Sequence, residues 1–137
     1  MANHKYYAVM LIDDNEIDNL INQKMIESIS LSKKIYLHSG ARSAIEFLKS
    51  LGELIEDTGV KILPELIFLD IDMPLMDGFQ FLDQFKTLNK KIVNHCKIIM
   101  LTSSTNPRDT NRAEKYGLIH KYLNKPLTQD LLREINV

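Results

Sequence analysis

The sequence predicts an α/β protein with a doubly wound, five-stranded parallel sheet and helices on both faces. Short apolar runs of strand length alternate with longer segments of helical periodicity, and this pair of patterns occurs five times. Parallel strands need crossover connections, and these are right-handed, so the alternation favours helices on both sides of the sheet. Four of the apolar runs end in polar side chains. Such strand ends suit the ligand-binding carboxyl edge of a flavodoxin-like sheet, whose strand order 2-1-3-4-5 is the order we expect.

The first half of the chain contains two of these strand and helix pairs. A strand near 6–12 precedes a helix near 15–29, in which one apolar stripe repeats at helical spacing: Ile17, Leu20, Ile21, Met25 and Ile29. A second strand near 34–38 precedes a helix with a similar stripe: Ala41, Ala44, Ile45, Leu48 and Leu51. Stripes of this width ordinarily face the core of a globular protein.

The second half contains the other three pairs. The third strand, 66–70, ends at Asp70 and is followed by a helix near 79–88. A strand near 97–101 precedes Asn106 and Pro107, which offer an N-cap and a proline at the first helical position. A strand near 119–123 and a short helix from about Thr128 complete the chain. The segment 51–64 is long for a connection, and the sequence does not assign it a role.

Composition and length indicate one ordinary globular domain, 1–137, without an effector domain. Hydrophobic residues at 45% and charged residues at 26% exclude a disordered or low-complexity function. The formal net charge is -1, with basic and acidic residues interspersed, so the sequence shows no basic stripe of the kind that binds nucleic acid. The first apolar run stops at Asp13 and is too short for a membrane span or a secretory signal, and the single Cys96 excludes an internal disulfide. We therefore expect a cytoplasmic location.

Polar side chains at four strand ends define the candidate site. Asp13 and Asp14 follow the first strand, Asp70 ends the third, Thr102 follows the fourth apolar run, and Lys125 follows the fifth. In the expected order these strands are neighbours about 4.8 Å apart, so the side chains can converge at one edge.

Three converging carboxylates need a positive partner, because each pair at 4 Å repels by about 4 kcal/mol at an effective dielectric constant of 20. Oxygen ligands of this kind suit Mg²⁺, whose remaining positions are open to phosphate oxygens. The Lys125 ammonium can supply a second positive charge, and the Thr102 hydroxyl can donate to a phosphoryl oxygen. Asp70, alone at its strand end, is the best candidate for a nucleophile that accepts a phosphoryl group.

Each residue also has an ordinary structural interpretation. Asp13 and Asp14 precede a helix, where acids favour the helix dipole by at most about 1 kcal/mol. Thr102 and Lys125 can be turn residues, and Tyr122 can be a half-buried strand residue. The common position of these groups at strand ends favours the site interpretation for the three acids, Thr102 and Lys125.

Four motifs resemble the receiver domain of bacterial two-component response regulators of the chemotaxis-regulator type. In chain order they are Asp13-Asp14, the stretch 69–78 (LDIDMPLMDG), the stretch 101–104 (LTSS) and Lys125-Pro126. Any one of them is a weak signal, whereas all four in order span essentially the whole chain.

The resemblance implies a role for each matching residue. Asp70 would be the phosphoacceptor, and Mg²⁺ would be held by Asp14, Asp70 and the backbone carbonyl of Asp72, with Asp13 acting largely through water. Thr102 and Lys125 would bind the phosphoryl group. Tyr122 matches an aromatic position that moves inward with Thr102 on phosphorylation, and the peptide bond between Lys125 and Pro126 would be cis.

The function that this resemblance implies is a stand-alone response regulator. Its phosphoryl group would come from a sensor histidine kinase or a histidine phosphotransfer protein, and phosphorylation would change a surface that binds an unknown downstream protein or forms a homodimer. No nucleic-acid or membrane partner is expected. Two alternatives stay open: a haloacid-dehalogenase-like phosphatase, since Asp70-Ile71-Asp72 resembles its paired aspartates, and a receiver-fold binding module that is never phosphorylated.

Overall fold

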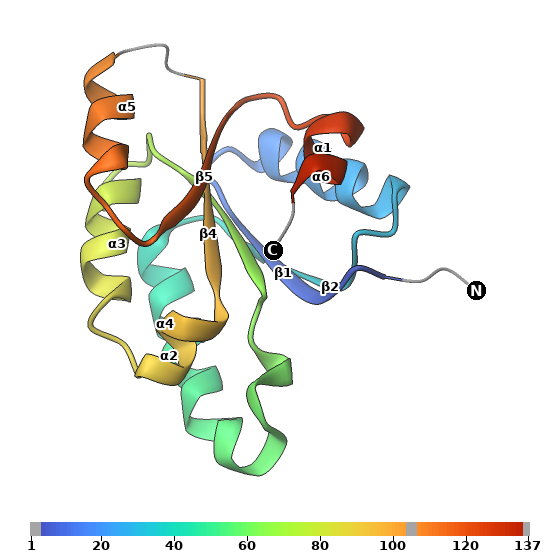
Figure 1. The fold of residues 1–137 in the computed structure, drawn as a ribbon, viewed down its shortest axis with the longest axis vertical. Coiled ribbons are helices and arrows are strands. Elements are labelled where there is room, and N and C mark those ends of the chain that lie inside the picture. Colours follow the sequence, from blue (N-terminus) through green and yellow to red (C-terminus); the bar gives the residue numbers. More distant parts are fainter. Residues whose placement is uncertain (1–3, 104–106, 136–137) are drawn as a thin grey trace.

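The computed structural model describes residues 4–103 and 107–135, which form one five-stranded sheet with helices on both sides (Figure 1). The sheet order is β2-β1-β3-β4-β5, and every described pairing of neighbouring strands is parallel. This confirms the expected fold class and strand order. The strands are β1 (Tyr6–Ile12), β2 (Ser32–His38), β3 (Leu66–Asp70), β4 (Lys97–Thr102) and β5 (Ile119–Asn124).

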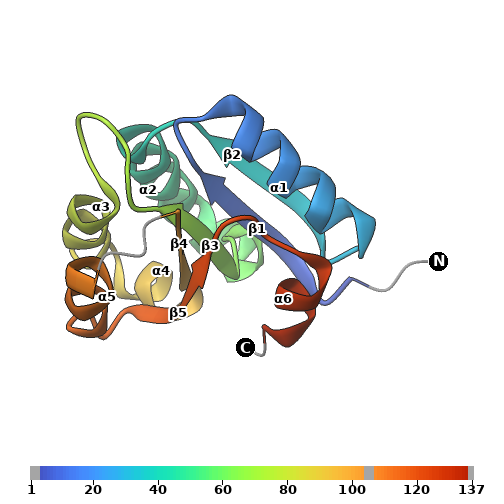
Figure 2. The ribbon, with the colours of Figure 1, turned by 90° about the horizontal axis from the view of Figure 1, so that it is seen from above.

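Helices cover the two faces of the sheet unequally. From above, α1 and α6 lie on one face, and α2, α3, α4 and α5 lie on the other (Figure 2). The helices are α1 (Glu16–Ser28), α2 (Ala41–Thr58), the 3₁₀ helix η1 (Val60–Ile62), α3 (Gly78–Phe85), α4 (Lys90–His95), α5 (Pro107–Glu114) and α6 (Gln129–Glu134). None of the helices within the described residues is both long and apolar enough to cross a membrane.

The sheet separates two apolar cores. Residues of β3 are buried along their whole length, and their side chains alternate between the two cores. The larger core holds Phe79, Phe81 and Phe85 of α3 together with the apolar stripe of α2. The smaller core holds Ile26 of α1 and Leu132 of α6. Burial on both faces explains why β3 reads as a continuous apolar run rather than an alternating one.

Helix α1 packs through only part of the stripe that its sequence suggests: Met25 and Ile29 contact the smaller core, but the N-terminal part of the stripe is exposed. Asn19, Asn22 and Ile26 face inward, whereas Ile17, Leu20 and Ile21 are 69%, 52% and 46% exposed. We call Ile17, Leu20 and Ile21 the α1 apolar surface. The Asn19 side-chain amide explains the rotation, because it donates to the backbone carbonyls of Asp13 at 3.0 Å and His38 at 3.2 Å. These bonds tie the polar side of α1 to the ends of β1 and β2.

The long segment 51–64 is mostly a continuation of α2, which ends where Gly59 adopts a left-handed φ of 77°. Helix α4 is an element that the sequence did not predict. It has six residues, too few for a periodic pattern, and packs its buried Ile92 against α2 at Gly52, where a Cβ would lie 2.9 Å from the Ile92 Cδ1 atom.

The structure confirms two of the predicted helix starts, whereas the predicted N-cap of a third helix is not among the described residues. Asn15 caps α1 by accepting from the backbone N–H groups of Ile17 and Asp18. Thr128 caps α6 by accepting from Leu131. The proposed N-cap Asn106 lies outside the described residues, although α5 does begin at Pro107.

Candidate functional site: an acidic pocket at the carboxyl edge of the sheet

The three predicted carboxylates meet at the carboxyl edge of the sheet. Asp13, Asp14 and Asp70 each place an oxygen within 4.8 Å of the others. The register of the strands explains this, because Ile12 of β1 pairs with Leu69 of β3, so the residues that follow them are neighbours. Asp13 and Asp70 are buried, and Asp14 is exposed.

Asp13 is held from two sides. Its Oδ1 atom accepts from the backbone N–H of Asn15 at 2.9 Å, and its Oδ2 atom accepts from the Lys125 ammonium at 2.6 Å. Its backbone carbonyl accepts from the Asn19 side chain. These bonds make Asp13 a fixed part of the site.

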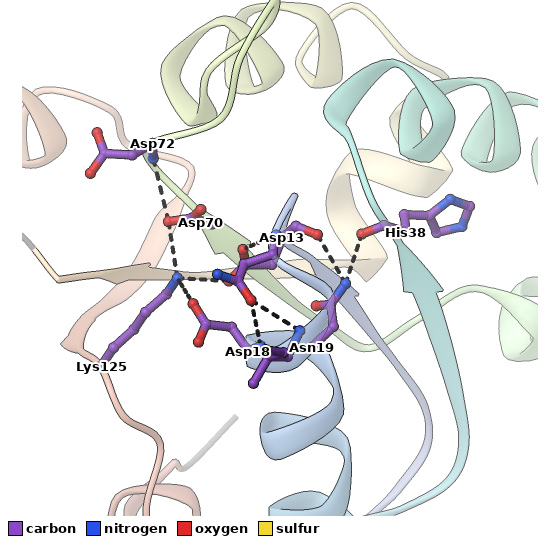
Figure 3. A network of polar contacts seen from close by, with 9 residues as sticks. Asp13, Asp18, Asn19, His38, Asp70, Asp72 and Lys125 are labelled. Atoms are coloured by element: carbon purple, nitrogen blue, oxygen red, sulfur yellow. Dashed lines mark hydrogen bonds and ion pairs between the residues drawn. The ribbon is translucent and has the colours of Figure 1, made fainter.

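Lys125 binds three carboxylates from three elements (Figure 3). Its Nζ atom lies 2.6 Å from Asp13 Oδ2, 3.2 Å from Asp18 Oδ2 and 3.4 Å from Asp70 Oδ1. Burial disfavours the charged ammonium, but the hydrogen bond to Asp13 and the charges of Asp70 and Asp13 outweigh it and raise the pKa of Lys125. Lys125 is therefore a fixed cation at this edge.

The positive charge of Lys125 does not fully offset the effects that disfavour the ionised Asp70 carboxylate. Burial first, and then the negative charge of Asp13, raise the pKa of Asp70 to about 7, while Lys125 and the Asp72 backbone N–H act in the opposite direction. That N–H donates to Asp70 Oδ1 at 3.3 Å, and the exposed Asp72 side chain points away from Lys125 (Figure 3). A further positive charge at this place would favour the ionised form of Asp70.

The turn after β3 fixes the position of the Asp70 carboxylate. Gly78 donates its backbone N–H to the Ile71 carbonyl at 2.9 Å, and a Cβ on Gly78 would lie 2.9 Å from the Asp70 carbonyl oxygen. Only glycine permits this close approach. Asp77 then caps α3 in a capping box with Gln80. The motif after Asp70 thus forms the turn and caps α3, in addition to indicating the site in the sequence.

Thr102 ends β4, and Lys125 directly follows the adjacent strand β5. Thr102 is the buried last residue of β4, and its carbonyl accepts from the Lys125 backbone N–H at 2.7 Å. The peptide bond between Lys125 and Pro126 is cis. Tyr122 lies in β5 opposite Met100 and packs against the larger core, and its buried hydroxyl has no hydrogen-bond partner in the described part of the chain.

Asp18 belongs to the site although the sequence did not predict it. It lies in the first turn of α1, four residues after Asp14, and its carboxylate reaches Lys125. Its position in the first helical turn after the acidic strand end was the only local signal, and its partner Lys125 is distant in the sequence.

Comparison with known proteins identifies the class that this fold and site define. The family of response regulator receiver domains matches residues 9–136, and the chain belongs to that family. The chain is 25% identical over 130 residues to the probable methanogenesis regulatory protein FilR2 of Methanothrix harundinacea, covering 94% of this chain and 79% of that protein. It is 28% identical over 129 residues to the sensor histidine kinase CheAY of Helicobacter pylori, covering 94% of this chain but only 14% of the kinase.

Solved structures agree with this assignment. A two-component response regulator from Cytophaga hutchinsonii is 30% identical with a TM-score of 0.78, covering 95% of this chain and 93% of that one. A response regulator receiver protein from Dyadobacter fermentans is 26% identical with a TM-score of 0.80 and 93% coverage of both chains. Receiver domains are signalling domains that accept phosphoryl groups from histidine kinases and generally bind Mg²⁺ in an acidic pocket. This chain is therefore a receiver of two-component signalling, and these relatives do not favour the phosphatase alternative.

Proposed function

We propose that Asp70 is the phosphoacceptor of this receiver and that its donor is a phosphohistidine of a sensor kinase or phosphotransfer protein. An oxygen of the Asp70 carboxylate would form a bond to phosphorus as the bond from phosphorus to the histidine nitrogen breaks, and the released imidazole takes up a proton. The observation that carries this proposal is the buried Asp70 carboxylate at the end of β3, 3.4 Å from the Lys125 ammonium.

The donor set fits Mg²⁺. Three carboxylates within 4.8 Å of one another are hard oxygen ligands, and burial together with the negative charge of Asp13 raises the pKa of Asp70, which a bound cation would oppose. Asp13, Asp14 and Asp70, together with the backbone carbonyl of Asp72, would hold the ion. When bound, the ion supplies positive charge to the phosphoryl oxygens.

Lys125 and Thr102 would bind the transferred phosphoryl group. Lys125 already contacts Asp70, and the backbone bond between Lys125 and Thr102 keeps the two residues side by side. Tyr122, on the adjoining strand with its hydroxyl unpaired among the described residues, is the proposed responder to phosphorylation. Its movement would alter the surface of α5, β5 and α6, where we place the contact with a downstream protein or with a second copy of the chain.

The α1 apolar surface is the proposed docking place for the phosphodonor protein. Its three side chains lie on the helix whose first turn contributes Asp18 to the site, so a protein seated there can reach Asp70. Leu20 also lines an open pocket with Leu37 and His38. Exposed apolar side chains beside a hollow suit the amphipathic helices of a partner protein.

The experiment that tests Asp70 is intact mass spectrometry after incubation with acetyl phosphate and Mg²⁺. We expect the native chain to gain one phosphoryl group and Asp70→Asn to gain none. Asp57→Asn, which removes an exposed carboxylate at the far end of α2, should be labelled like the native chain. Labelling of Asp70→Asn at the native level would overturn the assignment.

Two additional measurements separate the alternatives. Catalytic turnover of p-nitrophenyl phosphate, many molecules per chain, would support a phosphatase. Failure of the native chain to bind beryllofluoride in the presence of Mg²⁺ would support a binding module that is never phosphorylated. We expect stoichiometric beryllofluoride binding and no sustained turnover.

A further inference from the structure

Asp18 makes a contact with Lys125 that the proposed chemistry does not require. Its Oδ2 atom lies 3.2 Å from the ammonium, and its side chain is 39% exposed, compared with 15% for Lys125. It is therefore the most solvent-accessible of the three carboxylates that contact the ammonium, whereas Asp13 and Asp70 are buried (Figure 3).

The number of carboxylates around the Lys125 ammonium equals the number of its hydrogen-bond donors. A lysine ammonium has three donors. Asp13 and Asp18 accept hydrogen bonds at 2.6 Å and 3.2 Å, whereas Asp70 is the most distant partner at 3.4 Å. A phosphoryl group on Asp70 therefore meets an ammonium that is already bound to two other carboxylates.

Asp13 and Asp18 differ in how replaceable they are. Asp13 is buried and also bound by the Asn15 backbone, so loss of its bond to Lys125 would leave a buried charge unpaired. Asp18 is partly in solvent, and water can take its place on Lys125 at little cost. Removing Asp18 would thus leave the ammonium in position while removing one negative charge that competes with the phosphoryl group.

We propose that Asp18 is a positioning residue that holds the Lys125 ammonium back from the phosphoryl group on Asp70. The inference rests on the proposed function of Asp70 and Lys125. In this arrangement Asp18 weakens the grip of Lys125 on the phosphoryl group and shortens the life of the phosphorylated state.

The test is a beryllofluoride titration with Mg²⁺, followed by the decay of the phosphorylated protein after labelling with acetyl phosphate. Asp18→Asn should bind beryllofluoride about threefold more tightly and lose phosphate about threefold more slowly, in line with the weight of a partly exposed ion pair. Asp18→Glu, which keeps the charge, should return both values toward those of the native chain. Glu16→Gln is the matched control, because it removes one exposed charge from the same helical turn.

A double variant tests whether the effect passes through Lys125. In a Lys125→Ala background, Asp18→Asn should no longer change beryllofluoride affinity, because the group it acts on is gone. An equal effect of Asp18→Asn and Glu16→Gln, or a weaker affinity in Asp18→Asn, would overturn the inference while leaving Asp70 as acceptor. Failure of the native chain itself to bind beryllofluoride would instead overturn the proposed function.

Discussion

Helices α1 and α2 have similar apolar stripes but bury them to different extents, since only Met25 and Ile29 of the α1 stripe contact the core. Helix α2 buries its stripe on the sheet, with Leu48 fully covered. Helix α1 buries Asn19 and Asn22 and leaves Ile17, Leu20 and Ile21 in solvent. An apolar stripe therefore indicates a surface that packs against something, but it does not say whether that partner is the sheet or another protein.

Polar bonds near the start of α1 decide its orientation. The Asn19 amide donates to the carbonyls that end β1 and β2, and the next side chain toward the N-terminus, Asp18, reaches Lys125. A carbonyl left unpaired in a buried place costs about 1–3 kcal/mol, which is comparable to burying one leucine side chain. The contacts of Asn19 and Asp18 beside the acidic site thus orient α1 so that the α1 apolar surface faces outward.

The largest loss of stability is expected for the buried stripe of α2. Leu48→Ala removes a fully buried side chain from the larger core, and we expect the free energy of unfolding to fall by about 3 kcal/mol. Urea unfolding monitored by circular dichroism measures this loss. The exposed neighbour Lys49→Ala is the control and should change stability by less than about 0.5 kcal/mol. A loss below 1 kcal/mol for Leu48→Ala would contradict the assigned packing of α2.

The next effect concerns a polar residue on the inner side of α1. Asn19→Ala removes the side-chain donor from the carbonyls of Asp13 and His38, although the His38 carbonyl keeps the backbone N–H of Asp13 at 3.1 Å, and we expect the free energy of unfolding to fall by about 2 kcal/mol. The same urea titration measures it, with the exposed Lys24→Ala on the same helix as control. If Asn19→Ala were as stable as the control, the amide would not be what orients α1.

A smaller effect on free energy is expected on the outer side of α1. Leu20→Ser should leave stability within about 0.5 kcal/mol, because the side chain is already 52% exposed. If a phosphodonor protein docks there, its rate of transfer should fall about tenfold, equivalent to about 1.4 kcal/mol of lost contact. The measurement is transfer of label from a purified phosphorylated kinase or phosphotransfer protein that labels the native chain.

Two controls isolate docking from chemistry in that experiment. Labelling by acetyl phosphate should be the same in Leu20→Ser as in the native chain. Leu54→Ser changes a leucine on α2 that is 48% exposed and lies outside the α1 apolar surface, and it should accept label from the donor protein normally. Equal transfer rates in the two serine variants would remove α1 from the donor interface.

Local patterns were sufficient for most of the fold and for the core of the site. The strand order was expected from the alternation of strand and helix segments. The meeting of Asp13, Asp14 and Asp70 and the family were expected from the strand-end residues, because parallel strands bring their carboxyl ends to one edge. Elements that depend on contacts between distant segments were not predictable in this way. Helix α4 has too few residues for periodicity, and the role of Asp18 depends on Lys125, 107 positions away.

The rotation of α1 shows the same limit in another form. Periodicity identified the stripe from Ile17 to Ile29, but helical periodicity does not specify the angle of the helix about its own axis. That angle depends on where the Asp13 and His38 carbonyls lie after the strands have paired. The buried asparagines were the residues whose location contradicted the pattern.

The smallest effect is a pH dependence at the junction of the two helices. His38 ends β2, accepts the Asn19 bond through its carbonyl, and packs its ring 4.9 Å from the Phe47 ring of α2. Burial lowers the pKa of His38 below its ordinary value of 6.5. The unfolded chain therefore takes up a proton at His38 more readily than the folded chain, so this residue contributes stability above pH 6.5 that is lost as the pH falls below it.

Protonation of Asp70 changes stability in the opposite direction. Comparing two chains that both contain Asp70 cancels this contribution. Its pKa is raised to about 7, so the folded chain binds its proton more tightly than the unfolded chain and stability from this group rises as the pH falls. Urea titrations from pH 7.5 to 5 without Mg²⁺ should therefore be compared between the native chain and His38→Gln, in which Asp70 is unchanged. We expect stability to fall more, or rise less, toward pH 5 in the native chain, and the exposed His120→Gln to follow the native curve. Parallel curves for His38→Gln and the native chain would mean that the ring is not protected from protonation where α1 and α2 meet the end of β2.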